Sequence, residues 1–345
     1  MSDGRRNANG RSRYDGFRAV IKLVGTGPRG SRALHFEEAR AAMAALLSGE
    51  VSDAQAGAFL MAMRWKGESP EELAGMAQAL RDAARPLHAR SERPLVCCGT
   101  AYDGAAAAPH LSVAAAALAA AGGAGVVMHC GGPLGPKRGV TQGDVLAALG
   151  GAAEPDADAS ARMLERSGAT VVHTPAVVPG WERLARLRDQ IGVRGPVHAA
   201  ERLLAYFGSR RFVVAYTHGP YSERILGALE RLGAECAVTV RGIEGSDVVR
   251  PGRPSAFEAA GPLELPERLG DRIELEGTAQ GSAALTRAVL EGAAGGGAAR
   301  AVTLSAAVRL YAAGVETELP AAIRQAEEAL ADGRGLASLD ALVGA

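Results

Sequence analysis

The stretch that decides the fold is GEVSDAQAGAFLMAMRWKGESPEELAGMAQALRD, residues 49–82. In it Ser52 and Ser69 are each followed three residues later by Gln or Glu, and Pro70 comes directly after the second serine. A serine that caps a helix, with a Gln or Glu that reaches back to it, marks a helix start, and proline is favoured at the first helical position. Each pattern precedes a run with apolar residues at helical spacing. Together with a similar repeat over residues 36–46, the stretch predicts a block of three helices.

After residue 93 short β-type runs alternate with helical segments. The predicted strands are Leu95 to Cys98, Gly125 to His129, Thr170 to His173, Phe212 to Tyr216 and Cys236 to Val240. This alternation is typical of a mainly parallel sheet covered by helices. The sequence therefore predicts an α/β protein with a small all-helical domain and a larger α/β domain.

Three further segments carry a structural prediction. Residues 181–207 have helical character, and we expect them to rejoin the early helices in space. The glycine- and alanine-rich stretches 151–160 and 292–300 are predicted to be surface loops.

Composition limits the functional classes. With 38 basic and 38 acidic residues, no bulk charge marks a nucleic-acid or membrane binder. The first 17 residues are charged and lack an apolar run, so we interpret them as a disordered basic tail and not a signal peptide. The apolar stretch 111–128 is broken by Gly122 and Gly123, which favours a buried helix followed by a buried strand over a membrane span. We therefore expect a cytoplasmic protein without a membrane partner.

The four cysteines give no sign of a metal or disulfide framework. Their spacing contains no CxxC pair, so we expect free thiols packed as small apolar residues. They are Cys97, Cys98, Cys130 and Cys236.

A glycine-rich turn follows the first predicted strand, in the sequence LVCCGTAYDG of residues 95–104. Backbone N–H groups in such a turn can face an anion. The same turn can also be a plain strand exit.

These segments, with the late helix TLSAAVRLYAAG of residues 303–314, resemble the anthranilate phosphoribosyltransferase family, within the group that also holds pyrimidine nucleoside phosphorylases. The resemblance runs from about residue 18 to the C-terminus. It implies a helical domain, to which we assign residues 18–90 and 180–207, beside an α/β domain of residues 91–179 and 208–345. It also implies a phosphoribosyl site in the cleft between them, and a homodimer formed through the helical domain.

The family displaces pyrophosphate from phosphoribosyl pyrophosphate with an amine, which requires a diphosphate cradle, magnesium and an acceptor site. The family cradle is similar to residues 99–104, but two of its glycines are Ala101 and Tyr102 here. We expect the added side chains to weaken or alter phosphate binding. The retained candidates for the phosphate are Gly99, Thr100, Asp103 and Gly104.

Two further family motifs are similar to parts of this chain. The NxST motif corresponds to residues 110–113, where Ser112 keeps a hydroxyl, and His110 is either a catalytic base on the acceptor side or a polar residue at a helix start. The KHGNR motif corresponds to the start of residues 128–144, where Lys137 and Arg138 either bind an anion or belong to a solvated loop.

The resemblance also assigns metal and acceptor residues. In RGIEGSDVV, residues 241–249, Asp247 matches one magnesium-binding carboxylate, and Val248 replaces its acidic neighbour, which predicts a weakened magnesium site. Glu244 either compensates for the lost carboxylate or faces solvent. Arg194 matches the arginine that faces the anthranilate carboxylate. Val178 replaces a family histidine, which argues against anthranilate as the acceptor.

Two functions follow, and the sequence does not separate them. The first is a diverged glycosyl or phosphoribosyl transferase that binds a phosphorylated small molecule and uses a different acceptor. The second is a degenerate family member that binds nucleic acid, as in the branch of the family that has lost its phosphoribosyl motifs. Either function needs cationic groups that face phosphate.

Overall fold

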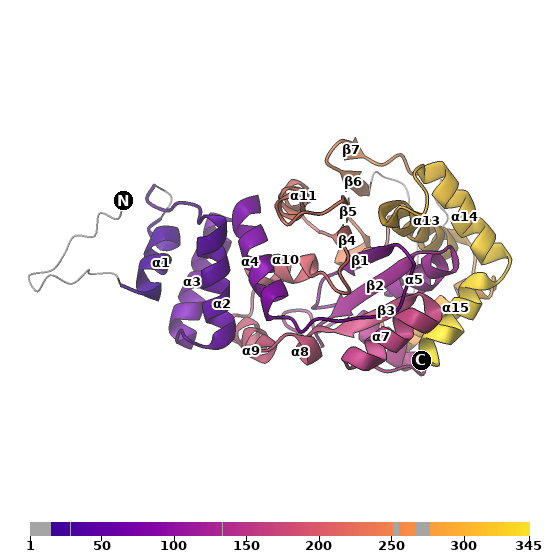
Figure 1. Ribbon diagram of the computed structural model, residues 1–345, viewed down its shortest axis with the longest axis horizontal. Coiled ribbons are helices and arrows are strands. Elements are labelled where there is room, and N and C mark those ends of the chain that lie inside the picture. Colours follow the sequence, from indigo (N-terminus) through magenta and orange to yellow (C-terminus); the bar gives the residue numbers. More distant parts are fainter. Residues whose placement is uncertain (1–14, 28, 133, 251–254, 267–276) are drawn as a thin grey trace, which may run out of the picture.

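The computed structural model describes residues 15–27, 29–132, 134–250, 255–266 and 277–345. Four helices come first and form one end of the molecule, indigo to purple in Figure 1. They are α1 (Phe17–Gly25), α2 (Phe36–Ser48), α3 (Asp53–Lys66) and α4 (Pro70–Ala83). Most of the expected basic tail lies outside the described residues.

The helix starts predicted by the two serines are confirmed. The Ser52 hydroxyl accepts the backbone N–H of Gln55 at the start of α3, and the Ser69 hydroxyl accepts that of Glu72 at the start of α4. In both boxes the longer side chain accepts the N–H of the serine in return. Helix α1 was not predicted.

A seven-stranded sheet forms the centre of the molecule, in the order β3-β2-β1-β4-β5-β6-β7. The first five strands are parallel, and they confirm the five predicted strands within two residues at each end. The last two form an antiparallel edge hairpin that was not predicted. The strands are β1 (Leu95–Gly99), β2 (Gly125–Cys130), β3 (Ala169–His173), β4 (Arg211–Ala215), β5 (Cys236–Val240), β6 (Ala256–Glu258) and β7 (Gly261–Pro262).

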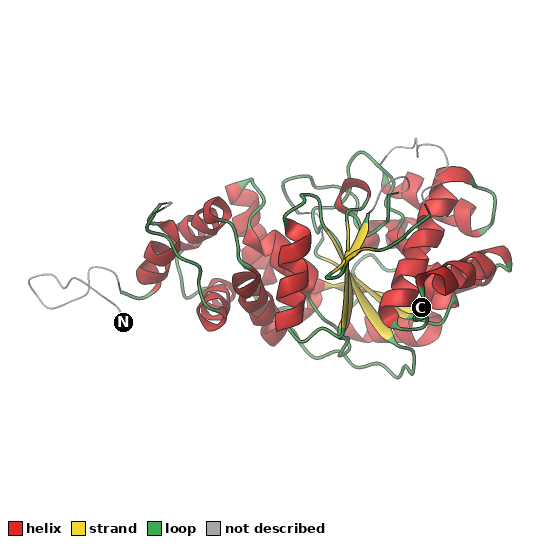
Figure 2. Ribbon diagram, turned by 90° about the horizontal axis from the view of Figure 1, so that it is seen from above, coloured by secondary structure: helices red, strands yellow, loops and turns green. Residues whose placement is uncertain are grey.

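Helices cover both faces of the sheet (Figure 2). Side chains alternate along β1: Val96 and Cys98 join one core, and Cys97 joins the other. The first core is closed by α5 (Ser112–Ala121), α6 (Gln142–Ala148), α7 (Ala157–Ser167), α12 (Ala279–Leu290), α13 (Gly296–Ala313), α14 (Leu319–Ala331) and α15 (Arg334–Val343). The second holds α1 to α4, α8 (Thr174–Val177), α9 (Trp181–Ile191), α10 (Pro196–Ala200), the 3-10 turn Glu201–Leu203 and α11 (Tyr221–Arg231). This architecture confirms the predicted fold class.

Segments distant in sequence meet at the helical end. Helix α9 contacts α2 and α3, and α10 contacts α3 and α4, so the segment after β3 does pack on the early helices. The domain limits assigned from the resemblance remain a prediction.

Two loop predictions are confirmed for residues 151–156 and 292–295 and are wrong for the residues that follow, which are helical. Within 151–160, Asp156 caps α7, and its carboxylate accepts the N–H of Ala159. Within 292–300, α13 already begins at Gly296. Glycine disfavours a helix, but Ala298 packs into the first core, and this packing stabilises the helix start.

The apolar stretch 111–128 is a buried helix, α5, followed by a buried strand, β2, as predicted. Among the described helices none has the length and apolar character needed to cross a membrane. The cysteines are free thiols; three are buried, and Cys236 is half-buried.

Candidate functional site

The turn after β1 contains a buried ion pair. Arg194 donates from Nε (2.9 Å) and Nη2 (2.6 Å) to one carboxylate oxygen of Asp103, whose side chain is fully buried. Two sequence-predicted site residues therefore meet, although they lie far apart in the chain. The other carboxylate oxygen of Asp103 has no hydrogen-bond partner among the described residues.

The two glycines of this turn are required by backbone packing. A Cβ on Gly99 would lie 2.0 Å from the carbonyl oxygen of Arg202. Gly104 has φ +70°, and a Cβ there would lie 2.4 Å from the backbone of Gly139. Both positions need glycine whether or not a ligand binds.

The Tyr102 side chain points away from the turn at which the sequence analysis expected it to interfere with phosphate. Its ring is fully buried, with its centroid 5.4 Å from that of Trp181, and its hydroxyl bonds to Thr174 (2.7 Å) and to the His129 ring. The aromatic side chain therefore packs into the second core, and its bulk does not cover the turn.

Beyond the turn, three consecutive backbone N–H groups converge on one carboxylate. Ala106 (3.0 Å), Ala107 (2.8 Å) and Ala108 (3.1 Å) donate to Glu244, and Lys137 Nζ lies 3.3 Å from the same carboxylate. We call these three N–H groups and the Lys137 ammonium the anion cradle. Burial acts to raise the pKa of Glu244, but the cradle's N–H groups and ammonium hold it below its usual value.

Lys137 and Arg138 point to different partners. Lys137 also donates to the carbonyl oxygens of Gly104 (2.9 Å) and Glu244 (3.1 Å). Arg138 pairs with Asp189 of α9, and both of those side chains are more than half exposed. Of the two predicted cations, Lys137 alone belongs to the anion cradle.

A second buried ion pair lies at the start of α5. The carboxylate of Asp247 accepts a hydrogen bond from the Ser112 hydroxyl on one oxygen and from Arg309 on the other. Arg309 also donates to the Ser112 carbonyl oxygen (3.0 Å), and the side chains of Asp247 and Arg309 are both 0% exposed. The pKa of Asp247 stays below its usual value because Arg309 and Ser112 outweigh the effect of burial, which acts to raise it.

Other buried polar atoms in this region lack partners. Gln142 donates to the Thr100 hydroxyl (2.6 Å), but its own amide oxygen accepts nothing from the described residues. The Nδ1 of His110 is likewise unpartnered, and burial lowers the pKa of His110 to about 4. Buried polar atoms are normally satisfied, so such unpartnered atoms are typical of sites that bind water or a ligand.

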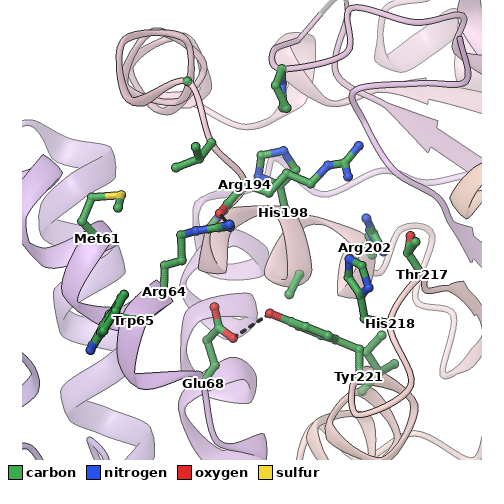
Figure 3. A pocket seen from close by; sticks show the side chains of 16 residues that line it. Met61, Arg64, Trp65, Glu68, Arg194, His198, Arg202, Thr217, His218 and Tyr221 are labelled. Atoms are coloured by element: carbon green, nitrogen blue, oxygen red, sulfur yellow. Dashed lines mark hydrogen bonds between the residues drawn. The ribbon is translucent and has the colours of Figure 1, made fainter. Parts of the chain in front are cut away.

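A cleft of about 700 Å³ separates the helical end from the sheet (Figure 3). Arg64, Trp65 and Glu68 line one wall, and Arg194 and Tyr221 approach from other elements. The Tyr221 hydroxyl donates to Glu68 (3.1 Å), and burial raises the pKa of this carboxyl. His110 is not among the lining residues, so the cleft brings only Arg194 of the two predicted acceptor residues to its surface.

The cleft wall formed by α3 was not singled out from the sequence. Arg64, Trp65 and Glu68 lie inside a helical pattern or next to it, where polar residues normally face solvent. The sequence offered one signal, Trp65 between Arg64 and Lys66, because a large aromatic residue between two charged residues of a helix is uncommon.

Comparison with known proteins agrees with this architecture. The model described as "Glycosyl transferase family, helical bundle domain" matches residues 18–84, and "Glycosyl transferase family, a/b domain" matches residues 95–258. Anthranilate phosphoribosyltransferase of Thermus thermophilus is 34% identical over 317 residues, covering 90% of this chain and 95% of that protein. The Syntrophobacter fumaroxidans enzyme is 33% identical, covering 89% and 93%. The chain belongs to the anthranilate phosphoribosyltransferase family.

Solved structures of the family extend the comparison. The crystal structure of the Thermus thermophilus enzyme has a TM-score of 0.80 and 33% identity, covering 91% of this chain and 96% of that chain. The Saccharomyces cerevisiae enzyme in complex with PRPP and Mg has a TM-score of 0.77 and 18% identity, covering 94% and 97%. The second likeness concerns the fold alone.

The three carboxylates singled out from the sequence are paired with cationic groups of this chain. Asp103 is paired with Arg194, Asp247 with Arg309, and Glu244 with the anion cradle. Among the described residues no group of three or more His, Cys, Asp or Glu side chains is placed to hold a metal ion.

Proposed function

We propose that the protein is a diverged phosphoribosyl-type transferase that binds a phosphorylated sugar ligand extending from the anion cradle into the neighbouring cleft, and that it transfers the sugar to an acceptor other than anthranilate. The observation that carries the proposal is the anion cradle at the carboxyl end of β1. Consecutive N–H groups and an ammonium that converge on one point form an environment suited to phosphate oxygens. In open α/β sheets, ligands bind at this edge.

The unpartnered atoms support a ligand in the same region. One oxygen of Asp103 and the amide oxygen of Gln142 are buried and accept no hydrogen bond from the described residues. Sugar hydroxyl groups would satisfy both acceptors. Transfer of the sugar builds positive charge on the ring in an oxocarbenium-like transition state, which the Asp103 carboxylate would stabilise electrostatically.

We further propose that magnesium is not part of this site. In the family Asp247 would be its ligand, but here both carboxylate oxygens are taken, by Ser112 and Arg309, and the group is shielded from water. A hydrated magnesium ion needs accessible oxygen ligands. The residues present therefore do not fit the metal, and the charge on the ligand would be balanced by Lys137 and the arginines of the cleft.

The acceptor proposal rests on Arg194. Its guanidinium donates two hydrogen bonds to Asp103, so an acceptor carboxylate would have to compete with a buried internal partner. Val178 cannot replace the hydrogen bonds of the family histidine. Both features disfavour anthranilate.

Calorimetric titration of phosphoribosyl pyrophosphate, with excess magnesium and with EDTA, tests the proposal. We expect binding in both conditions, with dissociation constants that agree within a factor of about three. Lys137→Ala should weaken binding about tenfold or more because it removes a charge-assisted contact. Arg138→Ala is the matched control, since this cation is paired with Asp189. Absence of binding in both conditions would exclude the proposal.

Nucleic-acid binding is a second candidate function, supported by one feature of the cleft. Trp65 is 85% exposed at the cleft wall, next to Arg64 and opposite Arg202. Exposed aromatic rings beside arginines bind single-stranded nucleic acid by stacking and charge. Fluorescence anisotropy with a labelled single strand at several salt concentrations is the test: a steep loss of affinity with salt, reduced in Trp65→Ala, would favour this function.

A further inference from the structure

We propose that Glu244 is a built-in competitor for the phosphorylated ligand: its carboxylate fills the anion cradle, and the ligand's phosphate must displace it. This inference rests on the proposed function. It adds a regulator to the same site.

Every group of the anion cradle contacts the Glu244 carboxylate. Three N–H groups from consecutive alanines, all within 3.1 Å of the carboxylate, are shared between its two oxygens. Lys137 adds the charge. A phosphate group presents the same kind of acceptor with more oxygens and more negative charge, so it can use the same donors.

The backbone of Glu244 has an unfavourable conformation. Its φ of 53° and ψ of 27° are left-handed, which is uncommon for a residue with a Cβ. Such strain persists where surrounding contacts impose it, and it is found at ligand sites and switches.

The position of Glu244 allows it to leave. Its side chain is 23% exposed, so a displaced carboxylate can reach water without crossing the core. Gly242 and Gly245 flank the residue, and Gly245 has a positive φ of 82°. The turn itself is held by backbone hydrogen bonds, such as the one from the Ile243 N–H to the Val248 carbonyl oxygen (3.1 Å), so displacement of the carboxylate is a rotation of the Glu244 side chain.

Self-occupancy lowers the apparent affinity for the ligand. When a site is open for only a fraction of the time, the apparent dissociation constant rises by the inverse of that fraction. Removal of the carboxylate should therefore tighten phosphate binding, although Glu244 lies in the binding region.

Calorimetric titration of inorganic pyrophosphate into the full-length wild type, Glu244→Ala and Glu244→Gln tests this inference. We expect Glu244→Ala to bind pyrophosphate about tenfold or more tightly than the wild type, with Glu244→Gln between them. The gain should disappear in the double variant Glu244→Ala with Lys137→Ala. Glu327→Ala is the matched control, because Glu327 also pairs with one cation, Arg300, but lies on α14.

The outcomes separate this inference from the proposed function. If wild type binds phosphoribosyl pyrophosphate but both Glu244 variants bind pyrophosphate equally well or less well than wild type, the competitor is excluded and the proposed function stands. If no form of the protein binds either compound, both are overturned. Circular dichroism checks folding, and Glu244→Gln, which keeps the side-chain shape, decides the question if Glu244→Ala unfolds.

Amide NMR tests independently where pyrophosphate binds. Pyrophosphate should shift the amide resonances of Ala106, Ala107 and Ala108 in wild type, because these N–H groups change partner. Binding that leaves these three resonances in place would also overturn the inference.

Discussion

Asp103 and Arg194 form an ion pair whose two side chains differ in burial. Asp103 is fully buried and one of its oxygens is already unpartnered, whereas Arg194 is one-third exposed. We predict that Arg194→Ala lowers the free energy of unfolding by about 3 kcal/mol, because it leaves a buried carboxylate without its cation. Urea unfolding at pH 7 measures the change.

The control for this prediction is Arg300→Ala. Arg300 pairs with Glu327 on the surface, and loss of an exposed pair should cost less than about 1 kcal/mol. Equal losses in the two variants would show that Arg194 contributes no more than a surface charge.

Asp247 and Arg309 lead to a prediction about both stability and metal binding. Asp247→Asn should lower the free energy of unfolding by about 3–5 kcal/mol, because Arg309 would keep a buried charge without its counter-ion. Magnesium chloride should not raise the melting temperature of the wild type beyond the effect of an equal ionic strength of sodium chloride. A magnesium-specific increase that Asp247→Asn abolishes would contradict the internal pairing.

The sequence identified candidate residues for the site, but not how they are paired, and their part in a site remains a prediction. Asp103, Ser112, Lys137 and Asp247 were identified from local motifs, because each lies in a short segment with a family counterpart. Their side-chain partners are 62 to 135 residues away in the chain, in elements whose relative placement no local pattern contains. The orientation of Tyr102 depends on a pocket formed by β2, α8 and α9, and so it was not predictable from the turn alone.

At the scale of elements, Glu72 does more than cap α4. Its buried carboxylate accepts hydrogen bonds from the N–H groups of Ser69 (2.8 Å) and Leu34 (2.7 Å) and from Lys66 Nζ (2.7 Å). One side chain thus joins the start of α4 to the end of α3 and to the segment before α2. We predict that Glu72→Ala lowers the free energy of unfolding by about 3 kcal/mol, since several donors lose their acceptor.

Ser52→Ala gives the comparison within the same helical block. The Ser52 hydroxyl caps α3 alone and is exposed, so its removal should cost about 1 kcal/mol. Urea unfolding of both variants measures the difference. A Glu72→Ala loss no larger than that of Ser52→Ala would show that the contacts to Leu34 and Lys66 add nothing.

Elements with strong local signals were predicted, and those stabilised mainly by tertiary contacts were not. The capped helices α3 and α4 and the five parallel strands have capping residues or apolar runs that are visible in the sequence. Strands β6 and β7 comprise three and two residues, and their pairing at the sheet edge is long-range information. Helix α13 begins in glycines, where packing against the first core overrides low helix propensity.

At the scale of the whole molecule, two cores share one sheet, and the early helices form one end of the molecule beside it (Figure 1). The homodimer implied by the resemblance remains a prediction. Light scattering should give a mass near twice 35.3 kDa at micromolar concentration, and a mass near 35.3 kDa would remove the dimer.

The buried histidines predict how stability of the whole molecule depends on pH. Burial lowers the pKa of His110 to about 4 and of His129 to about 3, and burial followed by the charge of Arg188 lowers that of His198 further. The unfolded chain would protonate these groups near pH 6.5, whereas the folded protein keeps them neutral. Between about pH 6.5 and pH 4 the unfolded state therefore binds more protons, and stability falls as the pH falls.

Glu201 acts in the opposite direction over much of this window. Burial raises its pKa to about 7, although Arg188 and Arg202 act to lower it, so the folded state binds this proton more readily than the unfolded chain between about pH 7 and pH 4.3. The proton that Glu201 binds in the folded state therefore offsets the proton that one of the histidines binds in the unfolded state. Three histidines outweigh this one carboxyl, so the free energy of unfolding should still fall as the pH falls between pH 6 and pH 4.5.

Urea unfolding at half-unit pH steps measures this slope, and His129→Gln tests its origin. His129 is fully buried between the rings of Tyr102 and Tyr206, so replacing it with a group that does not titrate should reduce the slope by about 1.4 kcal/mol per pH unit. The same substitution at the exposed His88 serves as the control. Because the slope is a difference between pH values, it separates the titration of His129 from any loss of packing, which would lower stability equally at every pH. An unchanged slope in His129→Gln would mean that this histidine titrates alike in the folded and unfolded chains.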